Sequence, residues 1–311
     1  MSIDWAIALH GGAGTILKDR MTPEKEAAYR QGLEVALAAG RTVLEAGGPA
    51  EDAVQASVVA LEDNPLFNAG RGAVLTADGS FELDAAIMRG HDMAVGAVFS
   101  VADVASPITL ARLILEQSPH VAFCGEGASR FARANGLPCV SQDYFETEYR
   151  RQQLEKARAM KVISLDHNDN KFGTVGAVAR DCNGNLAAAT STGGMTNKAP
   201  GRIGDSPVIG AGTYASNASC AVSATGHGEL FIRLTVARDI AAMMEYGGVT
   251  LMEAAQRKVL VELEKLEAES GGVIAVGKTG SPVLVFNSAG MYRASQCAGA
   301  QPVIGIYGDS D

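Results

Sequence analysis

Apolar residues along the chain follow two periods, and these periods predict where helices and strands lie. Thr22-Pro23-Glu24 is a helix N-cap and first-turn sequence, and the helical pattern behind it ends at Gly47-Gly48. Similar patterns predict helices at 50–62, from Ser106-Pro107, at 127–135, 229–246 and 251–266, and strands at 5–9, 81–88, 95–101, 173–180, 186–190, 220–224, 273–276 and 282–286. The glycine-rich run His10–Gly14 is expected to be a turn. Because strands and helices come in runs, the order favours stacked layers of sheet and helix over a regular βαβ wind.

The pattern changes most abruptly in the middle of the chain. Residues 144–160 are charged with a helical period, and 166–171 are polar without any period, so we expect an exposed linker over about 144–173. The strand pair that follows turns at Asn183-Gly184 and is apolar enough for a buried sheet. No repeat or second core separates the two halves, so residues 1–311 are expected to form one domain with the linker inside it.

Composition and charge exclude several classes of partner. The chain is 47% hydrophobic and 20% charged, with a net charge of −9 and no Lys/Arg runs, so nucleic acid is not an expected partner. The N-terminus lacks a basic leader and no apolar stretch is long enough to cross a bilayer, so we expect a cytoplasmic protein with no membrane contact. The five cysteines are far apart and lack C-x-x-C spacing, which favours reduced core thiols over zinc or a redox pair.

Thr174 is the candidate nucleophile, because it stands between the polar segment and a buried strand. A threonine hydroxyl needs a base, and the nearest base to an N-terminal threonine is its own α-amino group. If the Thr174 hydroxyl attacks the Gly173 carbonyl, an ester forms, water opens it, and a free amine appears beside the same hydroxyl. That amine has a pKa close to neutrality and can act as a general base, so no histidine or metal is required. Gly173 leaves the attacked carbonyl unshielded. Taken alone, a threonine that begins a strand is more often structural than catalytic.

Two further motifs offer groups that suit this chemistry. The run from Thr190 to Gly194 ends the partner strand and would bring hydroxyls close to Thr174. Arg202 and Asp205 lie three residues apart on a glycine-rich loop and suit a zwitterion, since arginine binds an α-carboxylate and aspartate accepts from an α-ammonium group. A surface Arg–Asp pair without a ligand fits the same two residues.

A third motif, Ala224–Glu229, follows a strand and opens a helix. Its Thr225 hydroxyl and Gly226 amide can form an oxyanion hole. Taken alone, the motif is more often an ordinary helix entry with two glycines.

These segments together resemble one known family. GTVGAVA, TSTGG, GRIGDSP and ATGHGE, in this order and spacing, with HGGAG and NPLFNAGRGAVL before them, resemble the plant-type L-asparaginase and isoaspartyl peptidase family of N-terminal-nucleophile hydrolases. The likeness runs from Leu9 to beyond Met291. It implies an α+β fold with a four-layer αββα sandwich, self-cleavage between Gly173 and Thr174 into an α subunit (1–173) and a β subunit (174–311), and a dimer of such pairs, which is a heterotetramer.

The resemblance also implies a role for each motif residue. In that comparison Thr174 is the nucleophile, Thr192 supports it, Thr225 and the Gly226 amide form the oxyanion hole, and Arg202, Asp205, Gly228 and Asn68 bind the substrate. L-asparagine and β-aspartyl dipeptides are the implied substrates. The balance between them stays open, because both present the same β-carbonyl and zwitterionic end to Arg202 and Asp205.

No cofactor is implied for the chemistry, but the resemblance implies a structural sodium ion. Oxygen-only ligation suits such a hard cation. The implied ligands are the backbone carbonyls of Leu61, Glu62, Asn64, Phe67, Ala69 and Arg71.

Other functions remain as alternatives. A glycosylasparaginase shares the fold but usually enters a secretory route, for which this sequence shows neither a signal peptide nor a disulfide framework. A taspase-like protease would be expected to need a protein-binding surface, and the sequence gives no sign of one. The HGGAG segment suggests an esterase oxyanion turn, but no serine has the G-x-S-x-G flanks that an esterase needs. An uncleaved, non-enzymatic scaffold is the alternative from a different class.

Overall fold

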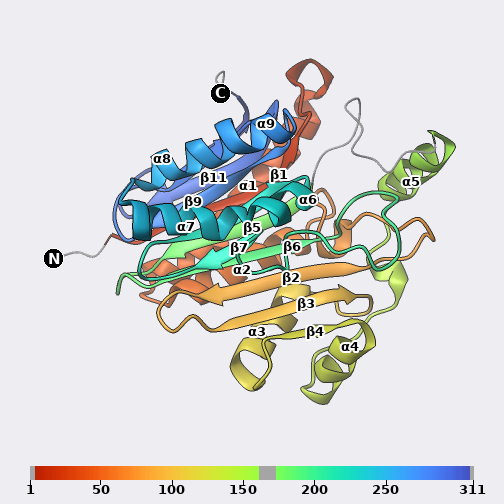
Figure 1. Cartoon of the computed structure of the whole chain (residues 1–311). Helices are drawn as coiled ribbons and strands as arrows, with labels where there is room; N and C mark the ends of the chain where they lie inside the picture. Colours follow the sequence, from red (N-terminus) through yellow and green to blue (C-terminus); the bar gives the residue numbers. More distant parts are fainter. Residues whose placement is uncertain (1–3, 161–172, 309–311) are drawn as a thin grey trace.

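The computed structural model describes residues 4–160 and 173–308 (Figure 1). Two of the helices begin at the predicted N-caps, Thr22 and Ser106. The side chains of these residues accept hydrogen bonds from the backbone N–H groups of Lys25 and Thr109 at 3.3 and 3.4 Å. The helices are α1 (Pro23–Glu45), α2 (Ala50–Glu62), α3 (Pro107–Gln117), α4 (Gly125–Ala134), α5 (Glu148–Met160), α6 (Gly228–Leu234), α7 (Val236–Gly247), α8 (Leu251–Gln256) and α9 (Glu264–Leu266), with the π-helical segment Arg257–Leu263 joining the last two. No helix in these two ranges is both long and apolar enough to cross a membrane.

An eight-stranded sheet carries the centre of the molecule. In spatial order it contains β12 (Val303–Tyr307), β11 (Gly290–Cys297), β1 (Ala6–Gly14), β5 (Thr174–Arg180), β6 (Leu186–Thr192), β2 (Leu83–Arg89), β3 (Val95–Val101) and β4 (Ala122–Cys124). All neighbours are antiparallel except β3 and β4. Strands from before and after residue 173 are interleaved, because β1 lies between β11 and β5, and β2 pairs with β6.

A second, four-stranded sheet lies against one face of the first. Its strands are β10 (Val283–Phe286), β9 (Gly271–Gly277), β8 (Cys220–Gly226) and β7 (Thr213–Ala215). Small residues fill the space between the sheets, including Ala8 and Ala188 from the large sheet and Ala224 from the small one, and such side chains allow close approach of two sheets. Helices α7 and α8 cover the outer face of the small sheet, and α1, α2 and α3 cover the outer face of the large one (Figure 1). The predicted combination of helices with two sheets is confirmed.

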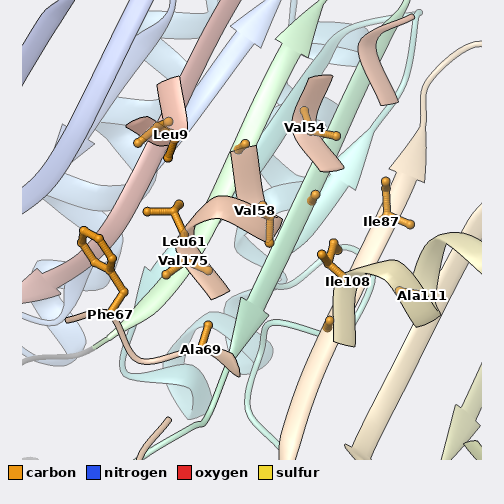
Figure 2. Close-up of a cluster of buried hydrophobic side chains, with 14 of the residues drawn as sticks. Leu9, Val54, Val58, Leu61, Phe67, Ala69, Ile87, Ile108, Ala111 and Val175 are labelled. Atoms are coloured by element: carbon orange, nitrogen blue, oxygen red, sulfur yellow. The ribbon is translucent and has the colours of Figure 1, made fainter. Parts of the chain in front are cut away.

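The larger core lies between the eight-stranded sheet and helices α2 and α3. Figure 2 shows Val54, Val58 and Leu61 of α2 along the strands of the sheet, with Leu61 beside Val175, and these residues and Leu9 are all fully buried. Each such side chain contributes about 1.5–3 kcal/mol by leaving water. This packing holds β5 rigidly against α2.

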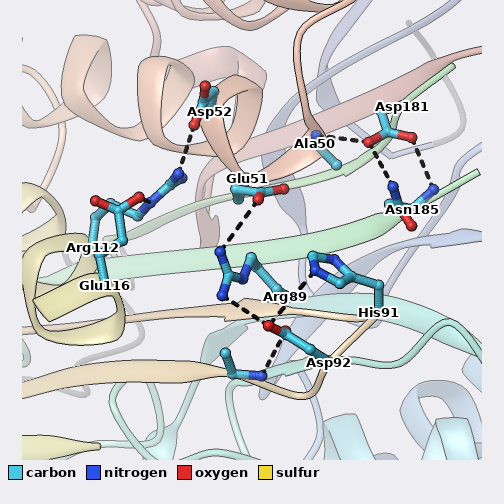
Figure 3. A network of polar contacts seen from close by, with 11 residues as sticks. Ala50, Glu51, Asp52, Arg89, His91, Asp92, Arg112, Glu116, Asp181 and Asn185 are labelled. Atoms are coloured by element: carbon cyan, nitrogen blue, oxygen red, sulfur yellow. Dashed lines mark hydrogen bonds and ion pairs between the residues drawn. The ribbon is translucent and has the colours of Figure 1, made fainter. Parts of the chain in front are cut away.

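An acidic side chain joins the β5–β6 turn to the start of α2. Pro49, the residue before α2, has no side-chain cap, and the Asp181 carboxylate instead accepts from the N–H of Ala50 at 3.3 Å. Asp181 also accepts from the N–H groups of Asn183 and Asn185 at 2.8 and 2.9 Å and so closes its own turn. Figure 3 shows Asp181 between Ala50 and Asn185. The hairpin is therefore anchored at its turn end, and its open end carries Thr174.

Two predictions about local structure need correction. His10–Gly14 is not a turn, because β1 continues to Gly14 through an irregularity between His10 and Gly12. Gly11 allows this continuation, since a Cβ there would lie 2.4 Å from a ring carbon of Phe67. Strand β6 also extends beyond residue 190, to Thr192.

The first half of the predicted exposed linker is a helix, as its period indicates, and most of its residues are exposed although the helix is anchored to the domain. Residues 148–160 form α5, which is docked by the fully or nearly buried side chains of Arg150 and Leu154, and Phe145 just before it is completely buried. A helix in a charged segment is therefore attached to the domain. The polar run 166–171 lies outside the described residues.

Candidate active site

Two threonines face each other at the open end of the β5–β6 hairpin. Thr174 begins β5, Thr192 ends β6, and the strand register pairs them directly. The Thr174 hydroxyl donates to Thr192 Oγ1 at 3.2 Å, and Thr192 Oγ1 also accepts from the Gly194 N–H at 2.9 Å. Both residues are buried, with 6% and 2% of their surface exposed. The predicted proximity of hydroxyls to Thr174 is thus confirmed.

Asn68 packs against the residue that precedes Thr174. A Cβ on Gly173 would lie 2.3 Å from the Cβ of Asn68, so only glycine fits there. The Asn68 carboxamide donates to the Gly194 carbonyl at 2.7 Å and accepts from the Val74 N–H at 2.8 Å. Asn68 therefore connects its own loop to both sides of the threonine pair.

A buried polar chain joins the backbone of Thr174 to the second sheet. His10 Nδ1 lies 2.9 Å from the Thr174 carbonyl oxygen, and His10 Nε2 lies 2.9 Å from Ser223 Oγ on β8. Ser223 Oγ is in turn 2.7 Å from Thr190 Oγ1. Burial lowers the pKa of His10 to about 3, although the contact with the Thr174 carbonyl opposes this shift. A neutral imidazole can then donate from Nδ1 and accept from Ser223, so His10 positions the Thr174 backbone and is a poor base.

Arg202 has a carboxylate partner that the sequence analysis missed. Its Nε and Nη2 atoms donate to the two carboxylate oxygens of Glu229 at 2.9 and 2.7 Å. Burial alone would raise the pKa of Glu229, but the hydrogen bond and charge of Arg202 lower it below its ordinary value. The guanidinium also lies beside Gly194 and Gly228, whose added Cβ atoms would be 3.5 and 3.1 Å from it. Glu229 stood in the ATGHGE segment, but nothing in the sequence paired it with Arg202.

Asp205 is a buried carboxyl between two glycines. Added Cβ atoms on Gly212 and Gly228 would lie 2.7 and 2.8 Å from its oxygens. Within residues 4–160 and 173–308, Oδ2 has no hydrogen-bond partner. Burial raises the pKa of Asp205 to about 7, against the opposing effects of its own backbone N–H and of Arg202. The alternative of a surface Arg–Asp pair is therefore wrong, because Asp205 is only 3% exposed and Arg202 pairs with Glu229.

Thr225 supplies an unused buried donor at the end of β8. Its hydroxyl is buried and has no hydrogen-bond partner among the described residues. Thr225 shares a strand face with Ser223, two residues earlier, which contacts the large sheet through Thr190. Gly226 has a φ of +155°, and a Cβ there would lie 2.2 Å from the Ser270 carbonyl, so this position requires glycine. The chain then enters α6, which begins at Gly228.

Two buried charges behind Thr192 were not predicted. Asp84 pairs with Thr192 in the β2–β6 register, and its Oδ1 accepts from the Ser100 N–H at 2.8 Å. Lys198 Nζ donates to the Glu82 carbonyl at 2.7 Å. Burial raises the pKa of Asp84 and lowers that of Lys198, and the charge of each partly offsets the shift of the other. In the sequence, Asp84 is a single acidic residue within a strand pattern, and nothing in that pattern indicates that it is buried beside Thr192.

The loop from Leu61 to Arg71 crowds several carbonyls together. A Cβ on Gly70 would lie 2.6 Å from the Glu62 carbonyl oxygen, and a Cβ on Gly72 would lie 2.1 Å from that of Phe67. The carbonyls of Leu61, Asn64 and Ala69 accept backbone hydrogen bonds of 3.3, 3.2 and 3.1 Å. Among residues 4–160 and 173–308, no group of three or more His, Cys, Asp or Glu side chains could hold a metal ion.

The side chain of Glu62 serves a separate, structural purpose. It accepts hydrogen bonds from Ser106 and Ser191, both at 2.6 Å, and from the N–H of Ile108 at 3.0 Å. Burial raises the pKa of Glu62 to about 7, and these donors oppose that shift. Glu62 thus joins α2, the start of α3 and strand β6.

Contacts connect most of the predicted site residues into one cluster. Thr174 contacts Thr192, Thr192 contacts Gly194, and Gly194 lies beside Arg202. Arg202 and Asp205 both lie against Gly228. The cluster combines the buried hydroxyl of Thr174, the residue directly after the Gly173–Thr174 peptide bond, with the guanidinium of Arg202 and the carboxyl of Asp205. These two charged groups suit the zwitterionic end of an amino acid.

The chain is similar to known proteins over nearly its whole length. The family model described as asparaginase matches residues 3–306. The isoaspartyl peptidase of Salmonella typhimurium is 54% identical over 97% of this chain and 98% of its own length, and that of Escherichia coli is 52% identical over 97% and 95%. The isoaspartyl peptidase/L-asparaginase of Homo sapiens is 45% identical over 92% of this chain and 91% of its own.

Proposed function

Because the chain belongs to the asparaginase family, we propose that it hydrolyses isoaspartyl dipeptides and the side-chain amide of L-asparagine, with Thr174 as the nucleophile. One observation carries this proposal: the Thr174 hydroxyl lies buried at the start of a central strand, directly after Gly173 and 3.2 Å from the Thr192 hydroxyl.

The nucleophile first has to become an N-terminus. Thr174 Oγ1 attacks the Gly173 carbonyl carbon, the C–N bond breaks, and the nitrogen of Thr174 takes up a proton. Water then hydrolyses the ester, which leaves a carboxylate on Gly173 and an amine on Thr174. Subunits of residues 1–173 and 174–311 result. The contact of Asn68 with Gly173 and the bond from His10 to the Thr174 carbonyl support this step, since both fix the backbone at the scissile bond.

In turnover the amine of Thr174 takes the proton of its own hydroxyl. The oxygen attacks the β-carbonyl of the substrate, and the negative charge develops on the carbonyl oxygen. The buried, unpartnered hydroxyl of Thr225 and the amide of Gly226 are the proposed donors to that charge. The leaving nitrogen receives the proton from Thr174, and water hydrolyses the β-aspartyl ester to release aspartate.

The zwitterionic end of the substrate is assigned to Arg202, Asp205 and the Gly228 carbonyl. Arg202 would share its guanidinium between Glu229 and the α-carboxylate, using the donors that Glu229 leaves open. Asp205 Oδ2 lacks a hydrogen-bond partner within the described ranges, which suits an incoming ammonium group. An ammonium ion would also favour the ionised form of Asp205.

We also propose a structural sodium ion in the loop that precedes and includes Asn68. The residues that would hold it through backbone carbonyls are Leu61, Glu62, Asn64, Phe67, Ala69 and Arg71. Glycine at positions 70 and 72 supports this loop conformation, because the backbone at both positions packs too closely against the carbonyl oxygens of Glu62 and Phe67 to admit a side chain. The ion would hold the loop that supports Asn68 and would take no part in bond breaking.

The finer architecture follows the same family. We propose that the stacked helices and sheets form the αββα sandwich of N-terminal-nucleophile hydrolases, and that two cleaved pairs assemble into a heterotetramer. A cytoplasmic location is supported by the five free cysteines. Only Cys220 of them is buried, so the expectation of core thiols is wrong for the other four.

Intact-mass analysis with N-terminal sequencing, followed by a substrate panel, tests the proposal. We expect a fragment that begins with Thr174 and a high kcat/KM on a β-aspartyl dipeptide and on L-asparagine. Dominant activity on glycosylated asparagine would instead assign the chain to the glycosylasparaginases. A fully active protein with an unbroken 173–174 bond would refute the mechanism, and an inert intact chain would favour a scaffold.

A further inference from the structure

The proposed self-cleavage lacks a base that the proposed turnover has. In the mature enzyme the free amine of Thr174 takes the proton of the Thr174 hydroxyl, but before cleavage that nitrogen is an amide bonded to Gly173 and cannot act as a base. His10 is a poor substitute, because burial lowers its pKa to about 3 and its Nδ1 atom is hydrogen-bonded to the Thr174 carbonyl. The first attack therefore needs another acceptor for the hydroxyl proton.

A row of three side chains crosses the large sheet at Thr174. Thr174 on β5 lies opposite Thr192 on β6, and Thr192 lies opposite Asp84 on β2 in the next strand pair. Residues that are directly opposite share one face of a sheet, and their Cβ atoms are about 5 Å apart. The row therefore ends in the carboxyl group of Asp84, which is completely buried.

The hydrogen bonds along this row are incomplete at one point. Thr192 Oγ1 accepts from the Thr174 hydroxyl at 3.2 Å and from the Gly194 N–H at 2.9 Å, and no described residue accepts the hydrogen of Thr192 itself. On Asp84, Oδ1 accepts from the Ser100 N–H at 2.8 Å, whereas Oδ2 has no partner in residues 4–160 and 173–308. A donor without an acceptor thus neighbours an acceptor without a donor. Such a pair is satisfied by a direct hydrogen bond or through one water molecule.

The backbone around Asp84 is shaped to hold this carboxyl group. The register between β2 and β3 shifts between Leu83 and Ala85, so Asp84 lies within an irregularity of the strand pair. Ser100, which donates to Asp84, has a φ of +49°, in the left-handed region that a serine rarely adopts. Bulges and strained residues of this kind are concentrated next to active sites, where they direct a side chain.

Two cations favour the ionised form of Asp84 and leave Oδ2 free. Burial raises the pKa of Asp84, the charges of Lys198 and Arg202 oppose this rise, and Glu82 adds to it. Lys198 donates to the Glu82 carbonyl and Arg202 pairs with Glu229, so neither cation occupies Oδ2. A carboxylate with a raised pKa and a free oxygen suits the task of accepting a proton.

We propose that Asp84 is the final proton acceptor in self-cleavage, which it serves through Thr192. The Thr174 proton passes to Thr192 Oγ1 as the proton of Thr192 passes to Asp84 Oδ2, and Thr174 Oγ1 bonds to the Gly173 carbonyl carbon. When the C–N bond breaks, the proton returns by the same path to the Thr174 nitrogen, and Asp84 is a carboxylate again. The inference rests on the proposed function. It confines this role of Asp84 to maturation, because the new amine is the base afterwards.

The test compares Asp84→Asn, Thr192→Val and the double variant with a matched control, Asp181→Asn. Asp181 is also a completely buried acid that accepts from backbone N–H groups, but it lies at the turn end of the β5–β6 hairpin, away from Thr174. Each full-length chain is isolated shortly after synthesis, and intact-mass analysis follows cleavage at 173–174 with time. Turnover of L-asparagine is divided by the cleaved fraction, and urea unfolding compares the uncleaved chains with Thr174→Ala.

We expect D84N to slow self-cleavage at least about 100-fold, in line with the loss of a general base. T192V should slow it to a similar extent. The double variant should cleave within about twofold of the slower single variant, because both substitutions interrupt one path. The cleaved fraction of D84N should turn over L-asparagine within about threefold of the wild type, and D181N should cleave at the wild-type rate.

A wild-type rate of cleavage in either D84N or T192V would overturn the proposal, so T192V decides the question even where D84N does not fold. Equal loss of cleavage and of turnover in D84N would assign Asp84 to the fold and also overturn it, as would losses that multiply in the double variant. A wild type that neither cleaves itself nor hydrolyses L-asparagine would instead reject the proposed function.

Discussion

Replacement of Asp205 by Asn should stabilise the substrate-free protein, and the gain should grow with pH. The carboxyl of Asp205 is 3% exposed, and burial raises its pKa from an ordinary 3.8 to about 7. Because the folded-state pKa is the higher one, the folded chain binds more protons between these two values. The stability contributed by this group therefore falls as pH rises.

The size of the effect follows from the two pKa values. At pH 8 the carboxyl is ionised in both states, and the difference between 3.8 and about 7 corresponds to roughly 4 kcal/mol of lost stability. At pH 5 the same calculation gives roughly 1.5–2 kcal/mol. An asparagine is neutral throughout, so its advantage over aspartate should increase by about 2–3 kcal/mol between these pH values. Any fixed cost of packing the amide cancels from that difference, as do the titrations of Glu62 and Asp84.

Urea unfolding of an intact chain is the suitable assay. Introducing Asp205→Asn into a Thr174→Ala background keeps one covalent chain, and a fixed protein concentration removes the effect of assembly. The unfolding free energies of the single and double variants are compared from pH 5 to pH 8. A difference that stays constant over this range would refute a buried Asp205 that is protonated below neutrality. In the active enzyme the same titration predicts that kcat/KM for L-asparagine rises through about pH 7, since the α-ammonium group needs the ionised carboxylate.

Three further substitutions address the proposed nucleophile and the proposed substrate anchor. Thr174→Ala should leave a single inactive chain of 32.2 kDa, because both cleavage and turnover use the same hydroxyl, and measurable turnover by this variant would contradict the assignment. Thr192→Val removes the hydrogen-bond partner of Thr174 and should lower kcat about tenfold with little change in KM, so a change in KM alone would point to substrate binding instead. Arg202→Ala leaves Glu229 as an unpaired negative charge beside the α-carboxylate and should lower kcat/KM for L-asparagine at least about 100-fold, while self-cleavage proceeds normally. Equal damage to both activities would indicate a folding defect.

Local signals allowed much of this fold to be predicted from the sequence. Thr22-Pro23 and Ser106-Pro107 begin helices because each hydroxyl satisfies a free backbone donor. The turn at Asn183-Gly184 joins the predicted strand pair, and the register brings Thr174 opposite Thr192. The pairing of the proposed nucleophile, Thr174, with Thr192 therefore depends on interactions within about twenty residues, which a sequence pattern records.

The remaining features depend on contacts between distant parts of the chain. No local pattern indicates that Arg202 pairs with Glu229. Nor does any local pattern indicate that Arg150, in the charged segment that forms α5, has a buried side chain. His10–Gly14 has the composition of a turn, and only the close packing of Phe67 over Gly11 explains why the strand continues. Burial of this kind is set by tertiary structure, which overrides local propensity.

The interleaved order of the large sheet has a consequence for how the mature protein is made. Neither product of the proposed cut contains the whole of the large sheet, because β1 lies between β11 and β5 and β2 borders β6. Assembly of the complete sheet must therefore come before scission, as an event within one polypeptide whose rate does not depend on dilution. Once cut, a denatured enzyme would have to regain its shape by a meeting of two separate molecules, so recovery should slow as the solution is diluted.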